Sequence, residues 1–291
     1  MPTPDATPMT TWQTTRFRID LGTPRVMGIV NVTPDSFSDA GQHADVKSAL
    51  AHCERLLREG ADLLDIGGES TRPGARRPSV GEELARVLPV LRDAVRLGVP
   101  ISVDTSTPAV IDAALALGVD IVNDVRALSN VEAMDLVAGH GSVGVCLMHM
   151  AGEPATMQGR AQYDDVLQTV AAFLRERRQA LCDRGVHADR IVLDPGIGFG
   201  KSVEHNLALL RRQRELLTLG SPLLVGWSRK STLGSITGRP VHERLAASVA
   251  AALIAVQRGA RIVRVHDVAQ TVDALALWRA LEPNNKKEDN R

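Results

Sequence analysis

The chain has 291 residues, and its 34 Lys and Arg residues balance its 34 Asp and Glu residues. A net charge of zero gives no reason to expect a nucleic-acid or membrane-surface partner, and no apolar run reaches membrane-spanning length. Hydrophobic residues make up 44% of the chain but aromatic residues only 3%, which favours packing of helices on a sheet over an aromatic-rich β-sandwich.

The N-terminal segment, residues 1–15, is rich in Thr and Pro and lacks the basic and apolar regions of a secretory signal. We therefore expect a flexible segment and a cytoplasmic protein. The three cysteines, Cys53, Cys146 and Cys182, show no CxxC spacing, so the sequence indicates neither a disulfide framework nor a zinc site.

Short apolar runs follow along the chain and predict β-strands. They have the composition expected of strands that are buried on both faces of a parallel sheet. The predicted strands are residues 26–30, 63–66, 101–103, 121–122, 144–148, 191–193, 223–226 and 262–265. Residues 16–23 are expected to add a strand or a hairpin that covers one end of the sheet.

Longer segments between the strands repeat apolar residues at helical spacing. The predicted helices are residues 45–59, 80–97, 108–117, 131–138, 163–184, 203–219, 241–258 and 267–281. Ser79 and Glu82 form a capping-box pair before the second of them. Several helices are followed by a glycine that suits a left-handed C-terminal cap. These glycines are Gly60, Gly98, Gly118, Gly185, Gly220 and Gly259.

Alternation of strands and helices requires a parallel sheet with right-handed crossovers. Eight such units predict an α/β fold of the (β/α)8 TIM-barrel type. A doubly wound open sheet is the alternative, although no GxGxxG motif opens the first helix. The expected organisation is a single barrel domain over residues 16–282, followed by a polar C-terminal tail over residues 283–291.

Each predicted strand leads to a polar residue, and in a barrel these positions face one mouth, where barrel enzymes carry out their chemistry. A single Asp after a strand is more simply explained as a helix cap, and Asp124 and Asp267 fit that explanation. Polar groups in all eight units instead favour a bound polar ligand, because buried charges need partners. The principal residues of this ring are Asn31, Asp65, Asp104, Asn123, Asp194, Lys230, Arg264 and His266.

Two loops at this mouth are distinctive. The loop 31–39, NVTPDSFSD, is long and rich in hydroxyl groups, and the loop 65–74, DIGGESTRPG, carries Thr71 and Arg72, which suit phosphate binding. Together they resemble the two signatures of dihydropteroate synthase, the folate-pathway enzyme that sulfonamides inhibit. The resemblance covers about residues 25–281 and continues in order through VDT 103–105, IVND 121–124, MHM 148–150, DPGIGFGK 194–201, SRKS 228–231 and RVHDV 264–268.

This resemblance implies a transferase that joins 6-hydroxymethyl-7,8-dihydropterin diphosphate to 4-aminobenzoate and releases 7,8-dihydropteroate and diphosphate. The implied partners are these two small molecules and, as is usual in the family, a second copy of the chain. Mg²⁺ is the implied cofactor, with Asn31 as its ligand. A single protein ligand is acceptable because Mg²⁺ keeps several waters beside substrate phosphates.

The resemblance also assigns the binding residues. The pterin edge, with its ring nitrogens, amino group and carbonyl, would meet a carboxylate, amide and ammonium set, and the ring would pack on apolar side chains. The pterin residues are Asp104, Asn123, Asp194, Lys230 and Met148, with Val125 as a further packing residue. The diphosphate residues are Asn31, Thr71, Arg72, Arg264 and His266. Stabilising the negative charge that grows on this leaving group would be the main way to lower the activation barrier.

The implied catalytic residues are Asp35, Lys230 and Arg264. Asp35 would stabilise the cationic pterin methylene that remains when diphosphate leaves before the amine attacks. Closure of the first loop would exclude water from this cation. The 4-aminobenzoate slot would be shaped by Phe37, Pro73, Phe199 and Ser231, with Ser231 binding the carboxylate. Asp65 is expected to support the ring without direct contacts.

Two other functions remain open at this point. A related pterin-binding barrel transfers a methyl group from methyltetrahydrofolate to a corrinoid protein, but it should not need the loop 70–73 or the segment 228–231. A non-catalytic paralogue would keep the pocket without the reaction. Lys201 resembles the lysine of a P-loop, but no GxxxxGK motif surrounds it, and His149 is expected to be structural. Ala40, Ala151 and Trp227 depart from the family pattern without removing a matched residue.

Overall fold

The structure is a computed structural model that describes residues 9–33, 42–70, 76–152 and 162–281, with residues 42–45 described by their backbone alone. Its main strands are β3 (Arg25–Asn31), β4 (Leu63–Gly67), β5 (Ile101–Asp104), β6 (Ile121–Asp124), β7 (Gly144–Met148), β8 (Ile191–Asp194), β9 (Leu223–Val225) and β10 (Ala260–Val265). These eight parallel strands close into a barrel in the order β10-β3-β4-β5-β6-β7-β8-β9. The predicted TIM barrel is confirmed, and the open sheet is wrong.

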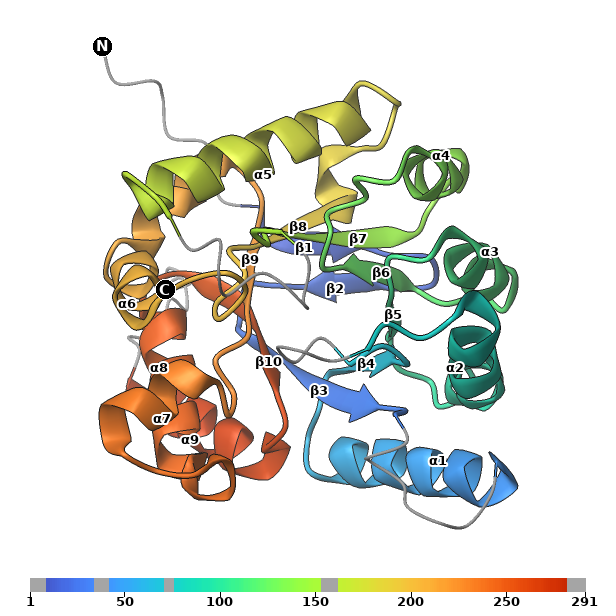
Figure 1. Cartoon of the computed structure of the whole chain (residues 1–291). Helices are drawn as coiled ribbons and strands as arrows, with labels where there is room; N and C mark the ends of the chain where they lie inside the picture. The colour runs from blue at the N-terminus through green and yellow to red at the C-terminus, as the bar shows by residue number, and fades with distance from the viewer. Residues whose placement is uncertain (1–8, 34–41, 71–75, 153–161, 282–291) are drawn as a thin grey trace, which may run out of the picture.

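Helices surround the ring of strands (Figure 1). They are α1 (Gln42–Arg58), α2 (Val80–Ala94), α3 (Pro108–Ala116), α4 (Val131–Gly139), α5 (Val166–Cys182), α6 (Val203–Arg211), α7 (Ser231–Thr237), α8 (Leu245–Gln257) and α9 (Val268–Leu281). None of the described helices is both long and apolar enough to cross a membrane.

The predicted helices are observed, except for changes on both sides of β9, the seventh strand of the barrel. The predicted helix 203–219 changes after Arg211 into a 3₁₀ helix, η4 (Gln213–Leu219), and 241–258 begins as the 3₁₀ turn η5 (Val241–Glu243) before α8. The short helix α7 was not predicted, because it contains Gly234 and β-branched residues, which are weak helix formers.

The predicted caps are confirmed. Ser79 and Glu82 form the capping box of α2 in both directions. The six glycines predicted to close helices all have positive φ, between +73° at Gly220 and +98° at Gly60. Each helix therefore turns back to the next strand through a backbone conformation that costs glycine little.

The alternation of side chains along each strand divides the interior from the shell. Ile121 and Val192 belong to a small apolar cluster inside the barrel, while Val122 and Leu193 belong to the large cluster beneath the helices. Since side-chain direction repeats every two residues, Asn123 and the other strand-end polar residues point inward, above this cluster.

A hairpin closes the other end of the barrel. Strand β1 (Thr11–Gln13) pairs antiparallel with β2 (Arg18–Asp20), and Trp12, the middle residue of β1, is fully buried in the inner cluster. Its indole Nε1 donates a hydrogen bond of 2.9 Å to the carbonyl oxygen of Arg190. The strand expected within residues 16–23 is confirmed as β2, but its partner β1 lies before that range and was not predicted. The expectation that residues 1–15 are flexible is wrong from Thr11 onward, because burial of Trp12 fixes this strand.

Replacing Trp12 by Ala should lower the free energy of unfolding by about 3–5 kcal/mol, because it leaves a large cavity at the end of the inner cluster. Urea denaturation followed by circular dichroism measures the change. Val131→Ala is the control: Val131 is 65% exposed, so its loss should change stability by less than about 0.5 kcal/mol. Equal stability of the two variants would contradict the role of the hairpin.

Candidate active site

A cavity of about 470 Å³ opens at the carboxyl ends of the barrel strands. Every predicted site residue that the structure describes lines it: Asn31, Asp104, Asn123, Met148, Asp194, Phe199, Lys230, Ser231, Arg264 and His266. The predicted residues Asp35, Phe37, Thr71, Arg72 and Pro73, and the departure at Ala40, lie outside the described residues. The fold therefore brings together predicted residues from seven of the eight barrel strands or from the loops that follow them.

Arg264 occupies the centre of the ring. Its Nε donates to Asp65 Oδ2 at 2.6 Å and its Nη2 to Asp104 Oδ2 at 2.7 Å, so one guanidinium joins two carboxylates from adjacent strands. Asp65 is fully buried and also accepts a hydrogen bond of 3.0 Å from Asn123 Nδ2. Asp65 thus holds Arg264 and Asn123 in place from below and does not line the cavity, as its expected supporting role requires.

The two carboxylates that share Arg264 are close enough to influence each other. Burial and the neighbouring charge of Asp65 raise the pKa of Asp104 to about 7, although Arg264 opposes this shift. Burial by itself lowers the pKa of Arg264, but Asp65 and Asp104 more than offset that effect, and its net shift is upward. Arg264 therefore stays charged, and Asp104 is the group whose protonation can change near neutral pH.

The opposite side of the cavity combines a carboxylate, an ammonium and an apolar wall. Burial raises the pKa of Asp194, whose Oδ1 accepts a hydrogen bond of 2.7 Å from the backbone N–H of Gly196. Burial also lowers the pKa of Lys230 to about 8. The Lys230 ammonium lies 4.0 Å from the centre of the Phe199 ring, a cation–π distance. Phe199 packs with Met148 and Val125, which gives this side of the cavity an apolar surface that suits a flat ring.

His266 is fixed by Ser228, a residue that the sequence analysis did not assign. Its Nδ1 lies 3.0 Å from Ser228 Oγ, and its backbone N–H donates to the same oxygen at 3.1 Å. Burial and the nearby charge of Arg264 lower the pKa of His266 to about 3. His266 is therefore neutral at physiological pH and offers hydrogen bonds without a positive charge.

Other cavity residues were missed. Glu69 lines the cavity and forms an ion pair with Arg126 at 3.0 Å, which connects the loops after β4 and β6. Arg244 also lines it and donates to the carbonyl oxygens of Arg229 and Arg239. The sequence placed Arg244 inside a helix, and its position at the N-cap of α8 depends on the break after η5. Trp227 is buried in the large core, and its indole N–H has no partner among the described residues.

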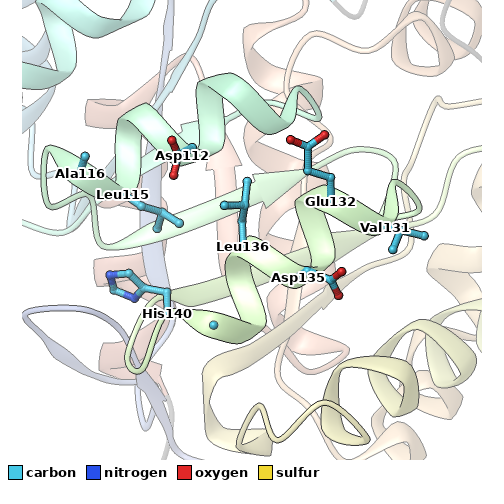
Figure 2. A pocket seen from close by; sticks show the side chains of 9 residues that line it. Asp112, Leu115, Ala116, Val131, Glu132, Asp135, Leu136 and His140 are labelled. Carbon is cyan, nitrogen blue, oxygen red and sulfur yellow. The ribbon is translucent and has the colours of Figure 1, made fainter.

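A second hollow lies on the outside of the barrel between α3 and α4 (Figure 2). Asp112, Leu115 and Ala116 from α3 face Leu136 and His140 from α4 and the turn after it. None of the predicted site residues lines this hollow. The cavity at the barrel mouth, where the buried charged groups converge, is therefore the candidate active site.

Comparisons with known proteins agree with this geometry. A family model described as "Pterin binding enzyme" matches residues 27–266. Dihydropteroate synthase from Neisseria meningitidis serogroup B is 53% identical over 279 residues, which cover 94% of this chain and 98% of that protein. The chain belongs to the dihydropteroate synthase family.

Solved structures of family members are also similar. Dihydropteroate synthase from Xanthomonas albilineans with 4-aminobenzoic acid has a TM-score of 0.86 and 51% identity, covering 91% of this chain and 96% of that one. The Burkholderia cenocepacia synthase complexed with 7,8-dihydropteroate has a TM-score of 0.84 and 50% identity, covering 93% and 96%.

Asp65→Asn should lower the pKa of Asp104 below about 7, because it removes a neighbouring negative charge while Arg264 remains. Asp104 is ionised above its pKa, so it would keep its negative charge down to a lower pH than in the unmodified chain. Carboxyl ¹³C NMR titration of Asp104 measures the shift. Asp267→Asn, which removes a carboxylate paired with Arg229, is the control and should leave the Asp104 titration unchanged. An Asp104 pKa that stays the same or rises in Asp65→Asn would contradict this account.

Proposed function

We propose that this cavity condenses (7,8-dihydropterin-6-yl)methyl diphosphate with 4-aminobenzoate to give 7,8-dihydropteroate and diphosphate, in folate biosynthesis. Membership of the dihydropteroate synthase family supplies the reaction, and one observation carries its assignment to this site. All ten described residues that were expected to bind substrate line one cavity at the barrel mouth. The chain is accordingly a transferase whose single pterin-binding domain is the barrel.

The pterin would lie between the polar centre of the ring and its apolar wall. Asp104, Asn123 and Asp194 offer carboxylate and amide groups to the ring nitrogens, the amino group and the carbonyl of the pterin edge. Lys230 adds an ammonium, and Met148 packs on the ring face. Asp104 uses one oxygen for Arg264, which leaves the other as an acceptor for substrate.

The diphosphate would lie beside Arg264 and His266. A guanidinium has five N–H donors, and Arg264 uses its Nε and one Nη2 donor on Asp65 and Asp104. The remaining donors can bind the anion while the carboxylates keep the guanidinium in position. Neutral His266 adds a hydrogen bond. These groups stabilise the charge that grows on diphosphate as the C–O bond breaks. Thr71 and Arg72 are proposed for the same side by resemblance.

Mg²⁺ is proposed as the cofactor, with Asn31 as its protein ligand. Asn31 is the last residue of β3 and lines the cavity. The described residues contain no cluster of three His, Cys, Asp or Glu side chains that could hold a metal. A lone amide ligand fits Mg²⁺, which keeps waters and binds substrate phosphates. When bound, the ion would neutralise charge on the diphosphate.

The 4-aminobenzoate would enter beside Phe199 and Lys230, with its carboxylate at Ser231 at the start of α7. Phe37 and Pro73 are proposed to complete this slot. Loss of diphosphate leaves a cationic pterin methylene, which Asp35 would stabilise until the arylamine attacks it. An arylamine is already a fair nucleophile, so the site needs no strong base.

The alternatives are less well supported. The relatives and structures compared are named as dihydropteroate synthases, which favours the synthase over a corrinoid methyltransferase. The ring of described site residues is intact, which argues against a non-catalytic paralogue. A cytoplasmic location is proposed because the three cysteines are all free thiols, as is usual in a reducing compartment.

A homodimer is proposed through the helices that follow β9 and β10. Large apolar side chains gather on this part of the described surface: Ile236, Val241, Leu245, Ile254, Leu277 and Leu281 are each more than a third exposed. They come from α7, η5, α8 and α9, and α8 packs against both α7 and α9. Exposed apolar side chains gathered on neighbouring elements are typical of protein interfaces.

The purified protein with Mg²⁺ should convert the two substrates to dihydropteroate and release diphosphate, and a sulfonamide should compete with 4-aminobenzoate. Product formation is followed by chromatography. Lys230→Ala and Asp104→Ala should each lower kcat/KM by at least about 100-fold, since each removes a partly buried charged group that lines the cavity. Lys47→Ala, at an exposed position of α1, is the matched control. No product above background from the unmodified protein would overturn the proposed function.

Ile254→Glu combined with Leu277→Glu should convert a dimer to a monomer, because burying two unpaired carboxylates in an interface is unfavourable. Analytical ultracentrifugation of the full chain measures its mass. Val131→Glu, an exposed apolar position on α4, should leave the dimer intact. An unmodified protein that sediments as a monomer would contradict the proposed interface.

A further inference from the structure

Lys201 is a buried cation that lines no part of the described cavity. It follows the segment 196–200 between β8 and α6 and is only 3% exposed. Its ammonium donates to the carbonyl oxygens of Gly196 at 2.9 Å and Phe199 at 3.1 Å, and it lies 2.9 Å from His149 Nδ1. A longer contact of 3.3 Å reaches the carbonyl oxygen of His149. An ammonium has three N–H donors, so these four acceptors satisfy it fully. The structure also argues against a P-loop role for Lys201, because its ammonium binds acceptors of the protein itself.

The segment before Lys201 is shaped so that these acceptors converge. Gly196 has φ +68°, and a Cβ built there would lie 1.8 Å from the carbonyl oxygen of His149. Gly200 has φ +63°, and its Cβ would lie 2.7 Å from the side chain of Ala151. Both positions therefore require glycine. The tight path brings carbonyls five and two residues before Lys201 to a single ammonium.

The same segment determines the position of cavity residues. Phe199, whose carbonyl Lys201 holds, presents its ring to the Lys230 ammonium at 4.0 Å. A Cβ on Gly198 would lie 3.0 Å from Lys230 Cδ, so the Lys230 side chain packs directly on this backbone. On the other side, His149 follows Met148, which packs on Phe199. A displacement of the segment would therefore move both Phe199 and Lys230.

We propose that Lys201 is a positioning residue for the aminobenzoate side of the active site. Its ammonium binds the carbonyls of Gly196 and Phe199 and both the carbonyl and the imidazole of His149, and so fixes the Phe199 ring against Lys230 without touching substrate. This inference rests on the proposed function, because it concerns the slot for 4-aminobenzoate.

A cation at this place has a specific physical reason. Desolvation of a buried ammonium is unfavourable, and burial lowers the pKa of Lys201 to about 7. An apolar side chain would avoid this cost but would remove the donor to the Phe199 carbonyl, the His149 carbonyl and the His149 imidazole. The Gly196 carbonyl would keep only the backbone N–H of Phe199. The Lys201 ammonium and the His149 imidazole do not repel each other. Burial and the Lys201 charge lower the pKa of His149 to about 3, so the imidazole stays a neutral acceptor.

The test compares the steady-state constants of Lys201→Met with those of the unmodified enzyme for each substrate separately. The KM for 4-aminobenzoate should rise about tenfold, while the KM for the pterin diphosphate should change less than about threefold, because Asp104 and Asn123 are held by other contacts. His149→Leu, which removes the imidazole acceptor and keeps the backbone carbonyls, should raise the same KM by a smaller factor. His149→Asn, which keeps an acceptor near the position of Nδ1, should restore most of the affinity.

Tyr163→Phe is the matched control. Tyr163 Oη donates to the carbonyl oxygen of Gly200 at 2.9 Å, so its loss disturbs the same segment without touching the Phe199 carbonyl. Its KM values should stay within about twofold of the unmodified enzyme. Equal changes in both KM values of Lys201→Met, no change in either, or the same selective change in Tyr163→Phe would overturn the proposal. If Lys201→Met does not fold, the two His149 variants and the control decide it by the same criterion.

A binding measurement tests the positioning role of Lys201 separately from the proposed function. If the unmodified protein makes no dihydropteroate, calorimetry with Mg²⁺ and diphosphate present measures its dissociation constant for 4-aminobenzoate. An increase of about tenfold in Lys201→Met alone would then support the positioning role. Equal dissociation constants, or no binding by the unmodified protein, would overturn it.

Discussion

The shared guanidinium of Arg264 is the interaction on which the mouth of this barrel depends. Asp65 is fully buried and Asp104 is partly buried, and two carboxylates on adjacent strands could not remain there without a common counter-charge. Arg264 supplies that charge from the last strand, and Asn123 adds a hydrogen bond to Asp65. The pairing aligns three strands at the site and leaves donors and acceptors over for a ligand that carries both an anionic group and a polar ring edge.

The ionisation of the ring follows from this arrangement. The groups that face the proposed substrates differ in protonation state. Arg264 is held charged and His266 is held neutral, while Asp104 and Lys230 have pKa values of about 7 and 8. Burial is the largest cause at Asp104, Lys230 and His266, so the shifts depend on the depth of the cavity within the barrel. A polar ligand that fills the cavity would find its hydrogen-bonding partners already oriented, which is how preorganised sites stabilise developing charge.

Much of this site could be predicted from the sequence, because in a closed parallel barrel every residue at the carboxyl end of a strand lies at the same mouth. Asn31, Asp104 and Asp194 each end a short apolar run, and the closed sheet gathers such ends at one mouth. The prediction that Arg264 pairs with Asp65 could not be made, because the register between β10, β3 and β4 is a property of the closed sheet. The family resemblance added roles to these positions, which spacing alone does not supply.

The features that were missed depend on contacts between distant segments. Lys201 is an ordinary exposed-looking lysine in the sequence, and only the fold shows that His149, 52 residues earlier, lies against it. Ser228 and Arg244 owe their places to the irregular backbone after β9, where α7 and the break after η5 give weak helical patterns. The strand at Thr11 was missed because Trp12 is a single apolar residue in a polar segment.

The pairing of the first and last barrel strands has a consequence for how the protein is made. Strand β10 hydrogen-bonds to β3, so the sheet cannot close until β10 has left the ribosome. Arg264 emerges 199 residues after Asp65, and until then the two inner carboxylates have no counter-charge. A partly synthesised chain must therefore keep this region open to water, and the catalytic centre and the finished fold are completed by the same late event.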